Sequence, residues 1–456
     1  MKIYRPISNL TFLSKIIERV VCGQLRDYLH KNNLDHPLQS AYKPGHSTES
    51  ALSKIADDVL KAMDRGDASL LTLLDLSAAF DTVDHEIMIH RLEHEFGLSG
   101  SALSWFRSYL TGRSQSVVAS GRYSTRHQLT CGVPQGSLLG PLLFILYTQP
   151  LAEVIERHGI AHHRYSDDCQ LYTSFSPKNK DCAVQDMETC VDAVKAWMIN
   201  NKLMLNDNKT EIILLGTPAV LKKCNLTSMR CGNCNVRVQA RAKSLGVFLD
   251  SNLSMKDHIN DLRKRTYFDI CSIGKIRHLL TKEATKTLVS AFVLSRLDYC
   301  NTLLAGVPNV LLAKLQLVMN NAARLVTGAK VSRHITPVLA ALHWLPIHAR
   351  VSYKLAVMGF SSAAGIAPSY IQEMIPPYQP TRILRSADSG LLQVPKMKTS
   401  LGQRAFSFQA SSVWNELPER LRTIDSLPAF KRALKTYFYL RYYKDCVSMD
   451  MGYGGE

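Results

Sequence analysis

The sequence lacks any hydrophobic run long enough to cross a membrane. Its longest apolar stretches, around residues 142–146 and 212–215, are far shorter than the roughly 20 residues that a membrane-spanning helix needs. Residues 1–13 contain no basic segment followed by a long apolar run, so we expect no secretory signal. Low-complexity tracts and short-period repeats are also missing. These absences predict an intracellular protein of the nucleus or cytoplasm with no membrane partner.

Acidic residues are scarce relative to basic ones. The 456 residues include 55 lysines and arginines and 38 aspartates and glutamates, for a net charge of +17. Such an excess favours a polyanionic partner, and nucleic acid before a membrane surface. The eleven cysteines show no regular spacing, which favours reduced thiols over a disulfide framework. Hydrophobic residues make up 46% of the chain, so a mainly disordered or fibrous protein is excluded.

Hydrophobic periodicity predicts an α+β block that is followed by a mainly helical part. A continuous apolar run over 69–76 indicates a buried strand that ends at Asp75, and a hairpin over 162–173 should carry Asp167 and Asp168 at its tip. We expect further strands at 115–118, 126–131, 210–215, 229–231, 236–239 and 244–249, and helices at 13–29, 48–63, 86–95, 102–110, 138–155, 184–200, 255–279, 283–304 and 309–326.

Three aspartates indicate a metal-dependent catalytic site. Asp75 and Asp167 are 92 residues apart, but they would converge with Asp168 if the strand and the hairpin are neighbours in one sheet. Crowded carboxylates repel one another unless a divalent cation lies between them, and hard oxygen ligands suit Mg²⁺. Two such ions, roughly 3.5–4 Å apart, can activate a hydroxyl and stabilise a leaving pyrophosphate. The pattern therefore indicates nucleotidyl transfer, although any one aspartate alone could be a turn or cap residue.

The sequence around these aspartates indicates a specific family of polymerases. The segments Asp75-Leu-Ser-Ala-Ala-Phe80-Asp81, Val133-Pro-Gln-Gly-Ser137 and Tyr165-Ser-Asp-Asp168, in that order, resemble motifs A, B and C of reverse transcriptases. Flanking segments resemble the polymerases of LINE-type (non-LTR) retrotransposons over essentially the whole chain. They are Tyr4-Arg-Pro-Ile-Ser8, Gln39-Ser-Ala-Tyr-Lys-Pro-Gly-His-Ser-Thr48, Leu205-Asn-Asp-Asn-Lys-Thr210, Leu342-His-Trp-Leu-Pro346 and Trp414-Asn-Glu-Leu-Pro418.

The resemblance implies a metal site and a sugar contact. Asp75, Asp167 and Asp168, together with the backbone carbonyl of Leu76, would bind two Mg²⁺ ions, with Mn²⁺ as a substitute. Phe80 matches the aromatic residue that lies under the incoming sugar and excludes a 2′-hydroxyl. An ordinary core phenylalanine is the alternative for Phe80.

Four further residues match family positions that contact the substrates. Gln135 and Gly136 match the loop that contacts the nascent base pair and the template, although a Pro-Gln-Gly loop can also be simple turn chemistry. Lys209 matches a catalytic basic residue that assists the leaving pyrophosphate. Lys43 stands where the family usually has an arginine that reaches the triphosphate, and lysine keeps the charge but loses the bidentate fork.

The sequence departs from the family pattern in two places. Ser166 replaces the usual alanine of motif C, which is a small-for-small change. Family polymerases have further fingers strands before Tyr4 and an endonuclease domain before those, and the 456 residues contain neither. The resemblance therefore predicts an N-terminally truncated copy with incomplete fingers.

Two smaller features allow more than one interpretation. Cys231 and Cys234 have zinc-like spacing but no second pair nearby, and the intervening Gly-Asn is a natural hairpin turn, which we favour. The basic run Arg263-Lys264-Arg265 could follow a phosphate backbone or form a solvated helix face.

Together these patterns predict a right-hand polymerase fold of the α+β class. Fingers and palm would span 1–250, with an antiparallel sheet in the palm, a helical thumb would span 251–330, and a mainly helical C-terminal region 331–456. The expected activity is RNA-directed DNA polymerisation with an RNA template, a DNA primer and deoxynucleoside triphosphates, and the sequence indicates no obligate protein partner. Two alternatives stay open: a remnant that only binds nucleic acid, and an RNA-dependent RNA polymerase.

Overall fold

The computed structural model describes residues 7–77, 80–206, 209–232, 234–379 and 390–450. The chain forms two compact units. Unit one contains residues 1–44, 70–212 and 225–239, and unit two contains residues 45–69, 213–224 and 240–456. No helix in the described ranges is both long and apolar enough to span a membrane.

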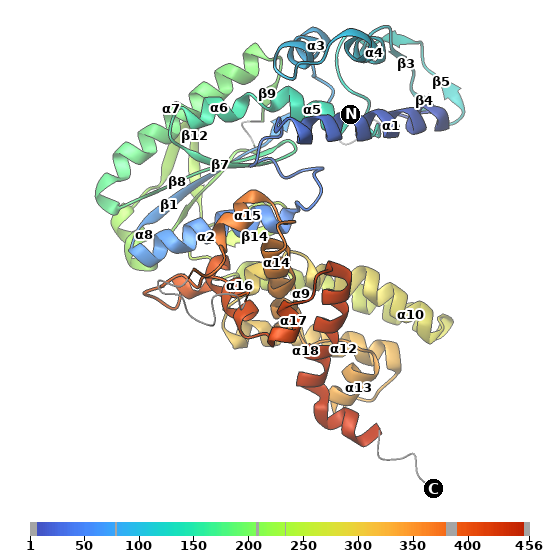
Figure 1. Ribbon diagram of the computed structural model, residues 1–456, viewed down its shortest axis with the longest axis vertical. Coiled ribbons are helices and arrows are strands. Elements are labelled where there is room, and N and C mark those ends of the chain that lie inside the picture. Colours follow the sequence, from blue (N-terminus) through green and yellow to red (C-terminus); the bar gives the residue numbers. More distant parts are fainter. Residues whose placement is uncertain (1–6, 78–79, 207–208, 233, 380–389, 451–456) are drawn as a thin grey trace. The chain divides into compact units, whose positions relative to one another are not determined.

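A six-stranded sheet carries the predicted aspartates (Figure 1). Its strands, in spatial order, are β11 (Ser228–Cys231), β12 (Cys234–Gln239), β10 (Glu211–Leu215), β1 (Ala68–Leu74), β8 (Asp168–Phe175) and β7 (Ala161–Tyr165). The pairs β7–β8 and β11–β12 are antiparallel hairpins. Leu70 and Leu71 of β1 are both fully buried, as expected for a central strand that is covered on both faces.

Two helices of unit one pack on this sheet. Helix α7 (Lys180–Asn200) contacts β8 and β11, and α6 (Leu151–Glu156) contacts both α7 and β7 (Figure 1). The predicted helix over 138–155 is in fact two helices, α5 (Gly140–Thr148) and α6. They separate at Pro150, which has no N–H to continue the hydrogen-bond ladder of α5 and instead precedes the first turn of α6.

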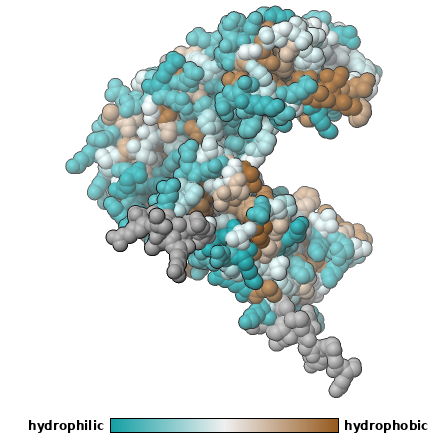
Figure 2. Space-filling model, in the orientation of Figure 1, coloured by the Kyte–Doolittle hydropathy of each residue, from teal (hydrophilic) through white to brown (hydrophobic). Residues whose placement is uncertain are grey.

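The remaining elements of unit one are short strands and amphipathic helices. They are α1 (Phe12–Lys31), α3 (His85–His94), α4 (Gly100–Leu110), η1 (Pro177–Asn179), and the two-residue strands β2 (Leu76–Ser77), β3 (Ser114–Gln115), β4 (Val118–Ala119), β5 (Arg122–Tyr123), β6 (His127–Gln128) and β9 (Met204–Leu205). Apolar side chains of α1 and of the β4–β5 hairpin are exposed, for example Phe12 and Tyr123 at 76% each, and the space-filling view shows brown surface at this hairpin (Figure 2).

Unit two is mainly helical, as predicted for the C-terminal part. Its elements are α2 (Thr48–Arg65), α8 (Pro218–Cys224), β13 (Arg241–Ser244), β14 (Val247–Asp250), α9 (Lys256–Ile276), η3 (Arg277–Leu279), α10 (Lys282–Val289), the π-helical turn η4 (Ser290–Leu294), α11 (Ser295–Asp298), η5 (Asn301–Leu304), α12 (Asn309–Thr327), α13 (Ile335–Ala341), α14 (Ile347–Ala363), α15 (Ser369–Met374), η6 (Gly402–Arg404), α16 (Phe406–Asn415), α17 (Glu419–Arg422) and α18 (Leu427–Asp450). Stacked Phe360 and Phe430, with Trp414, form part of its core.

The predicted helix over 283–304 is interrupted. Tyr299 is extended (ψ 119°) and Cys300 adopts a left-handed conformation (φ 50°), so the helix ends at Asp298 and a 3₁₀ turn follows. The Tyr299 hydroxyl donates a hydrogen bond to the Leu245 carbonyl at 2.7 Å. This contact lies 54 residues away in sequence, so the periodicity of the segment itself could not reveal the break.

Helix α2 is held in unit two by its acidic side chains. Glu49 pairs with Lys354 at 2.9 Å, Asp57 accepts a hydrogen bond from the Ser407 amide at 2.7 Å, and Asp64 accepts from the Thr399 amide at 2.8 Å. The sequence did not predict this association, because α2 and its partners are about 300 or more residues apart.

Candidate active site

Asp75 lies where strand β1 ends and the chain turns into β2. Leu76 pairs with Leu205 in the short β2–β9 ladder. The backbone carbonyl of Asp75 accepts a hydrogen bond from the Asn206 amide at 2.9 Å. These two contacts hold the backbone that directly follows the Asp75 side chain. Residues 78–79 and 207–208, which belong to the quoted motifs, lie outside the described residues.

Asp167 and Asp168 lie in the tight turn of the β7–β8 hairpin. Tyr165 and Asp168 face each other across the hairpin, so Ser166 and Asp167 form a two-residue loop. Ser166 has a left-handed backbone (φ 60°), as such loops require. The amide of Ser166 donates to the side-chain oxygen of Gln39 at 3.2 Å, and the Ala41 amide donates to the same oxygen at 3.0 Å. Gln39 is fully buried and thereby ties the turn to the segment before α2.

The three carboxylates share one electrostatic environment. Strands β1 and β8 are neighbours in the sheet. Burial, together with the negative charges of Asp167 and Asp75 and against the opposing charge of Lys209, raises the pKa of Asp168 to about 6. The fold thus brings the three predicted aspartates and Lys209 together. From the sequence, the aspartates were expected to meet only if the strand and the hairpin were neighbours in one sheet.

Lys209 neutralises one of these carboxylates. Its ammonium group lies 2.5 Å from Oδ2 of Asp75, and the two side chains are 59% and 23% exposed. The remaining two carboxylates, Asp167 and Asp168, are half-buried and repel each other. A set of hard oxygen ligands with unbalanced negative charge is the donor set that Mg²⁺ favours in proteins, so these residues fit a divalent metal ion.

Phe80 and the Pro-Gln-Gly loop are connected through Asp81. The ring of Phe80 lies 4.9 Å from that of Phe144, and the Phe80 carbonyl accepts from the Val133 amide at 2.8 Å. The side-chain amide of Gln135 donates to both carboxylate oxygens of Asp81 at 2.9 Å. Asp81 was not predicted as a site residue, although it directly follows Phe80 in motif A.

Glycines allow this loop to lie close to neighbouring backbone. Gly132 has φ 88°, and a Cβ atom there would lie 2.9 Å from the Asp81 carbonyl oxygen. Gly136 has φ 101° and is exposed. The carbonyl of the preceding Gln135 accepts from the Ser8 amide at 2.8 Å. Both glycines occupy conformations that other residues rarely adopt.

Glu18 of α1 is a second residue that sequence reasoning missed. It is 1% exposed and accepts hydrogen bonds from the Ser137 hydroxyl at 2.9 Å and the Leu138 amide at 2.7 Å. Tyr109 also donates to this carboxylate, at 3.3 Å. A buried carboxylate with several donors fixes the start of α5 behind the Pro-Gln-Gly loop. An acidic residue on the otherwise apolar face of α1 was the available signal.

Lys43 is bound within its own loop. Its ammonium group donates to the His36 carbonyl at 2.7 Å and lies 3.6 Å from Asp35. Burial, the dominant influence, lowers the pKa of Lys43. The predicted contact between Lys43 and a triphosphate therefore requires the side chain to leave these partners.

His36, Glu156 and His162 form a cluster whose ligand atoms lie within 4.8 Å of one another. The Leu38 amide donates to Nδ1 of His36 at 3.2 Å, so Nε2 carries the proton and donates to Glu156 at 3.3 Å. Nε2 of His36 then has no lone pair for a metal. Burial, together with the positive charges of Arg164 and Lys43, lowers the pKa of His36 to about 4. These cations would also repel a metal ion.

Cys231 and Cys234 are cross-strand partners in the β11–β12 hairpin, which agrees with the predicted turn. Gly232 has the left-handed backbone of that turn (φ 62°), and Asn233 lies outside the described residues. Among the described side chains, neither cysteine belongs to a cluster of three potential metal ligands.

The chain is similar in sequence to known polymerases. A family model described as "Reverse transcriptase (RNA-dependent DNA polymerase)" matches residues 1–249, more than half of the chain. The chain is 26% identical over 335 residues to "Probable RNA-directed DNA polymerase from transposon X-element" of Drosophila melanogaster, which is 72% of this chain and 36% of that protein. It is 28% identical over 292 residues to the corresponding protein from transposon BS of the same organism, which is 62% of this chain and 31% of that protein.

The chain spans about a third of the length of these curated relatives. Among solved structures, a telomerase from Candida albicans is 12% identical with a TM-score of 0.34, over 70% of this chain and 55% of that one. The predicted α+β class and the resemblance to retrotransposon polymerases are confirmed by the family match and by the names of the relatives. This chain belongs to the reverse transcriptase (RNA-dependent DNA polymerase) family.

Proposed function

We propose that this chain is an RNA-directed DNA polymerase of a non-LTR retrotransposon, which extends a DNA primer along an RNA template with deoxynucleoside triphosphates. The observation that carries the proposal is the convergence of Asp75, Asp167, Asp168 and Lys209 at one end of neighbouring strands. The net charge of +17 suits polyanionic substrates.

The carboxylates of Asp75, Asp167 and Asp168 would hold two Mg²⁺ ions, or Mn²⁺, with the Leu76 carbonyl as a further ligand. These ions would lower the pKa of the primer 3′-hydroxyl and stabilise charge on the leaving pyrophosphate. The 3′-hydroxyl gives its proton to water, the new bond joins the 3′-oxygen to the α-phosphorus, and the bond from that phosphorus to the bridging oxygen of pyrophosphate breaks. Lys209, beside Asp75, donates a proton to the leaving pyrophosphate.

The other predicted residues position the substrates. Phe80 excludes a 2′-hydroxyl by steric contact, and Gln135, oriented by Asp81, contacts the nascent base pair together with Gly136. Lys43 binds the triphosphate once it is released from Asp35 and the His36 carbonyl. Positioning of this kind accounts for a large share of the rate in phosphoryl-transfer chemistry.

The proposed organisation follows the predicted boundaries: fingers and palm over 1–250, thumb over 251–330 and a C-terminal region over 331–456. We place the protein in the nucleus or cytoplasm. The ten cysteines whose side chains the structure describes are not disulfide-bonded, which suits a reducing compartment.

Primer extension on an RNA template with Mg²⁺ and deoxynucleotides tests the proposal. We expect extension by the intact chain, loss of at least a thousandfold in Asp167→Asn, and wild-type rates in the control Asp181→Asn, whose carboxylate is 93% exposed on α7. A folded chain that binds RNA but extends no primer would overturn the proposal and leave the binding-only remnant.

Nucleotide choice separates the proposal from an RNA-dependent RNA polymerase. The intact chain should incorporate deoxynucleotides in strong preference to ribonucleotides, and Phe80→Ala should weaken this preference by removing the ring that contacts the sugar. Preferential ribonucleotide incorporation by the intact chain would contradict the assignment.

A further inference from the structure

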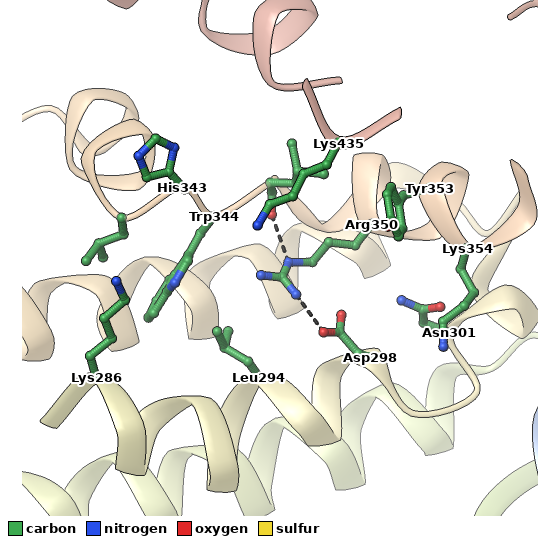
Figure 3. A pocket seen from close by; sticks show the side chains of 12 residues that line it. Lys286, Leu294, Asp298, Asn301, His343, Trp344, Arg350, Tyr353, Lys354 and Lys435 are labelled. Atoms are coloured by element: carbon green, nitrogen blue, oxygen red, sulfur yellow. Dashed lines mark hydrogen bonds and ion pairs between the residues drawn. The ribbon is translucent and has the colours of Figure 1, made fainter. Parts of the chain in front are cut away.

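Unit two contains a cavity that the proposed polymerase reaction does not use. Its volume is about 550 Å³, within the range typical of ligand pockets. The walls come from α10, η4, α11, α14, α18 and the segment 342–345 (Figure 3). This segment is part of the Leu342-His-Trp-Leu-Pro346 motif, to which the polymerase reaction gives no role.

The charged side chains of the cavity are mostly cationic. Arg350 pairs with Asp298 at 2.6 Å, and Lys354 pairs with Glu49 at 2.9 Å. The ammonium groups of Lys286 and Lys435 make no ion pair or hydrogen bond with any residue that the structure describes. Figure 3 shows both lysine side chains at the cavity, from opposite walls. Two cations are therefore available to an anionic ligand.

The surrounding sequence extends this positive charge. Residues 299–372 contain no aspartate or glutamate and include six lysines and arginines. Residues 427–444, which form most of α18, contain five lysines and arginines and again no acidic residue. Arg350 and Lys354 are paired with acidic residues from outside these stretches. The stretches nevertheless carry a large excess of positive charge, so we expect the ligand to be part of a polyanion.

Aromatic side chains give the cavity a second kind of contact. His343, Trp344 and Tyr353 line it together with the lysines. The backbone at Trp344 is fixed, since its amide donates to the Leu339 carbonyl at 3.0 Å and its carbonyl accepts from the Tyr443 hydroxyl at 2.5 Å. Aromatic rings beside lysines suit the base and the phosphate of a nucleotide. A base-paired nucleotide has its faces stacked within the helix, so the chemistry favours an unpaired one.

We propose that this cavity binds one unpaired nucleotide of a single-stranded RNA. Lys286 and Lys435 bind the phosphate, and the base packs against His343 and Trp344, which lie on the same side of Arg350 as Lys286 (Figure 3). The proposal rests on the proposed function for the identity of the strand, as the template copied by the chain. It adds an RNA contact in unit two, outside the catalytic residues of unit one.

A binding experiment on the full chain tests this without relying on polymerisation. The probe is a fluorescein-labelled single-stranded RNA of twelve uridines, and the readout is anisotropy over a series of salt concentrations. We expect Lys286→Ala/Lys435→Ala to bind about tenfold more weakly. The salt dependence should also fall by about 0.7 in log–log slope for each phosphate that the variant no longer neutralises.

The matched control is Lys282→Ala/Lys431→Ala. These lysines lie one helical turn earlier on α10 and α18, are exposed, and do not line the cavity, so the control removes the same charge from the same helices. The control should change affinity by less than twofold. Equal losses in the two double variants, or no loss in the first, would overturn the proposal.

Tryptophan emission locates the ligand independently of charge. RNA binding should quench the wild-type emission, and Trp344→Phe should remove most of this quenching while Trp105, Trp197 and Trp414 remain as background. Quenching that persists unchanged in Trp344→Phe would overturn the assignment to this cavity. Anisotropy and tryptophan emission both test RNA binding even if the chain has no polymerase activity, because neither measurement requires primer extension.

Competition distinguishes the strand from a free nucleotide. An unlabelled twelve-uridine RNA should displace the probe, whereas a blunt DNA duplex of equal length should do so much less effectively. If uridine monophosphate binds with the same dependence on Lys286 and Lys435 and as tightly as the RNA, the cavity is a free-nucleotide site and the assignment to a strand is wrong.

Discussion

The ammonium group of Lys209 lies 2.5 Å from a carboxylate oxygen of Asp75, although 134 residues separate them in the chain. Asp75 follows the central strand β1, and Lys209 follows the strand β9 that pairs with β2. The pair places a proton donor beside a predicted metal ligand.

Replacing Lys209 should slow the chemical step. In Lys209→Met we expect kcat for primer extension to fall at least tenfold, because general-acid assistance to the leaving pyrophosphate is removed. The Mg²⁺ concentration for half-maximal rate should not rise, since Asp75 loses a competing cation. Lys178→Met, an exposed lysine of the same unit, is the control. A Lys209→Met enzyme with the wild-type rate would contradict the assigned role.

Asp168 should make stability depend on pH. Its folded pKa of about 6 lies above the unfolded value near 4, so the folded state binds more protons between these values. The contribution of Asp168 to the free energy of unfolding therefore falls as pH rises from about 4 to about 6 and is then level. The difference between the two pKa values corresponds to roughly 3 kcal/mol, which solvent screening at this half-buried side chain reduces. Asp168→Asn should therefore be more stable than wild type by roughly 1–2 kcal/mol at pH 7.5 and equal to it near pH 4.

Thermal unfolding at the two pH values measures this difference. Asp27→Asn, an exposed carboxylate on α1, is the control and should show no such pH-dependent gain. Addition of Mg²⁺ at pH 7.5 should raise the Tm of wild type more than that of Asp168→Asn, because a ligand that binds only the folded state stabilises it. Equal stability of wild type and Asp168→Asn at pH 7.5 would contradict the raised pKa.

Gln39 should act as a positioning residue for the catalytic turn. Gln39→Ala leaves the buried amide of Ala41 and the partly buried amide of Ser166 without their acceptor, which should cost about 1–3 kcal/mol of stability. Primer extension should fall about tenfold or more through kcat. Gln149→Ala removes another side-chain hydrogen bond to backbone in unit one, to Leu34, and should lose stability without a comparable loss of kcat. Parallel losses of kcat in both variants would indicate a purely structural role.

The serine at position 166, where the family usually has alanine, should have little effect on activity or stability. Its hydroxyl is buried without a hydrogen-bond partner among the described residues, so Ser166→Ala should keep the activity and leave stability equal or up to about 1 kcal/mol higher. Ser166→Val should lose roughly 1–2 kcal/mol, because a β-branched residue is strained at φ 60°. Denaturant unfolding of the two variants compares these effects. A large loss in Ser166→Ala would show that the hydroxyl has a role.

Asp81 should control substrate affinity through Gln135. Asp81→Ala removes both acceptors of the Gln135 amide, and we expect the KM for deoxynucleotides to rise about fivefold with kcat changed by less than twofold. Asp81→Asn keeps one oxygen acceptor and should restore most of the affinity. Steady-state kinetics of single-nucleotide addition separates the two constants. If Asp81→Asn is as defective as Asp81→Ala, charge and not orientation is responsible.

Local patterns in the sequence predicted much of the fold and the centre of the site. The apolar run before Asp75 indicated a central strand, and the flanking turn residues indicated the hairpin of Asp167 and Asp168. The breaks at Pro150 and at Tyr299–Cys300 were missed. Pro150 lies within a long apolar segment whose hydrophobicity suits one continuous helix, and the second break accompanies a tertiary contact to Leu245.

The sequence by itself determined where the strands and turns around the aspartates form, because strand and turn preferences act over a few neighbouring positions. Only the tertiary structure decided which distant polar groups meet: Gln39 with Ser166, Glu18 with Ser137, and Glu49 with Lys354. Buried polar groups must find hydrogen-bond partners within the folded chain. Which partner each one meets depends on how separate segments pack, and no local pattern records that choice.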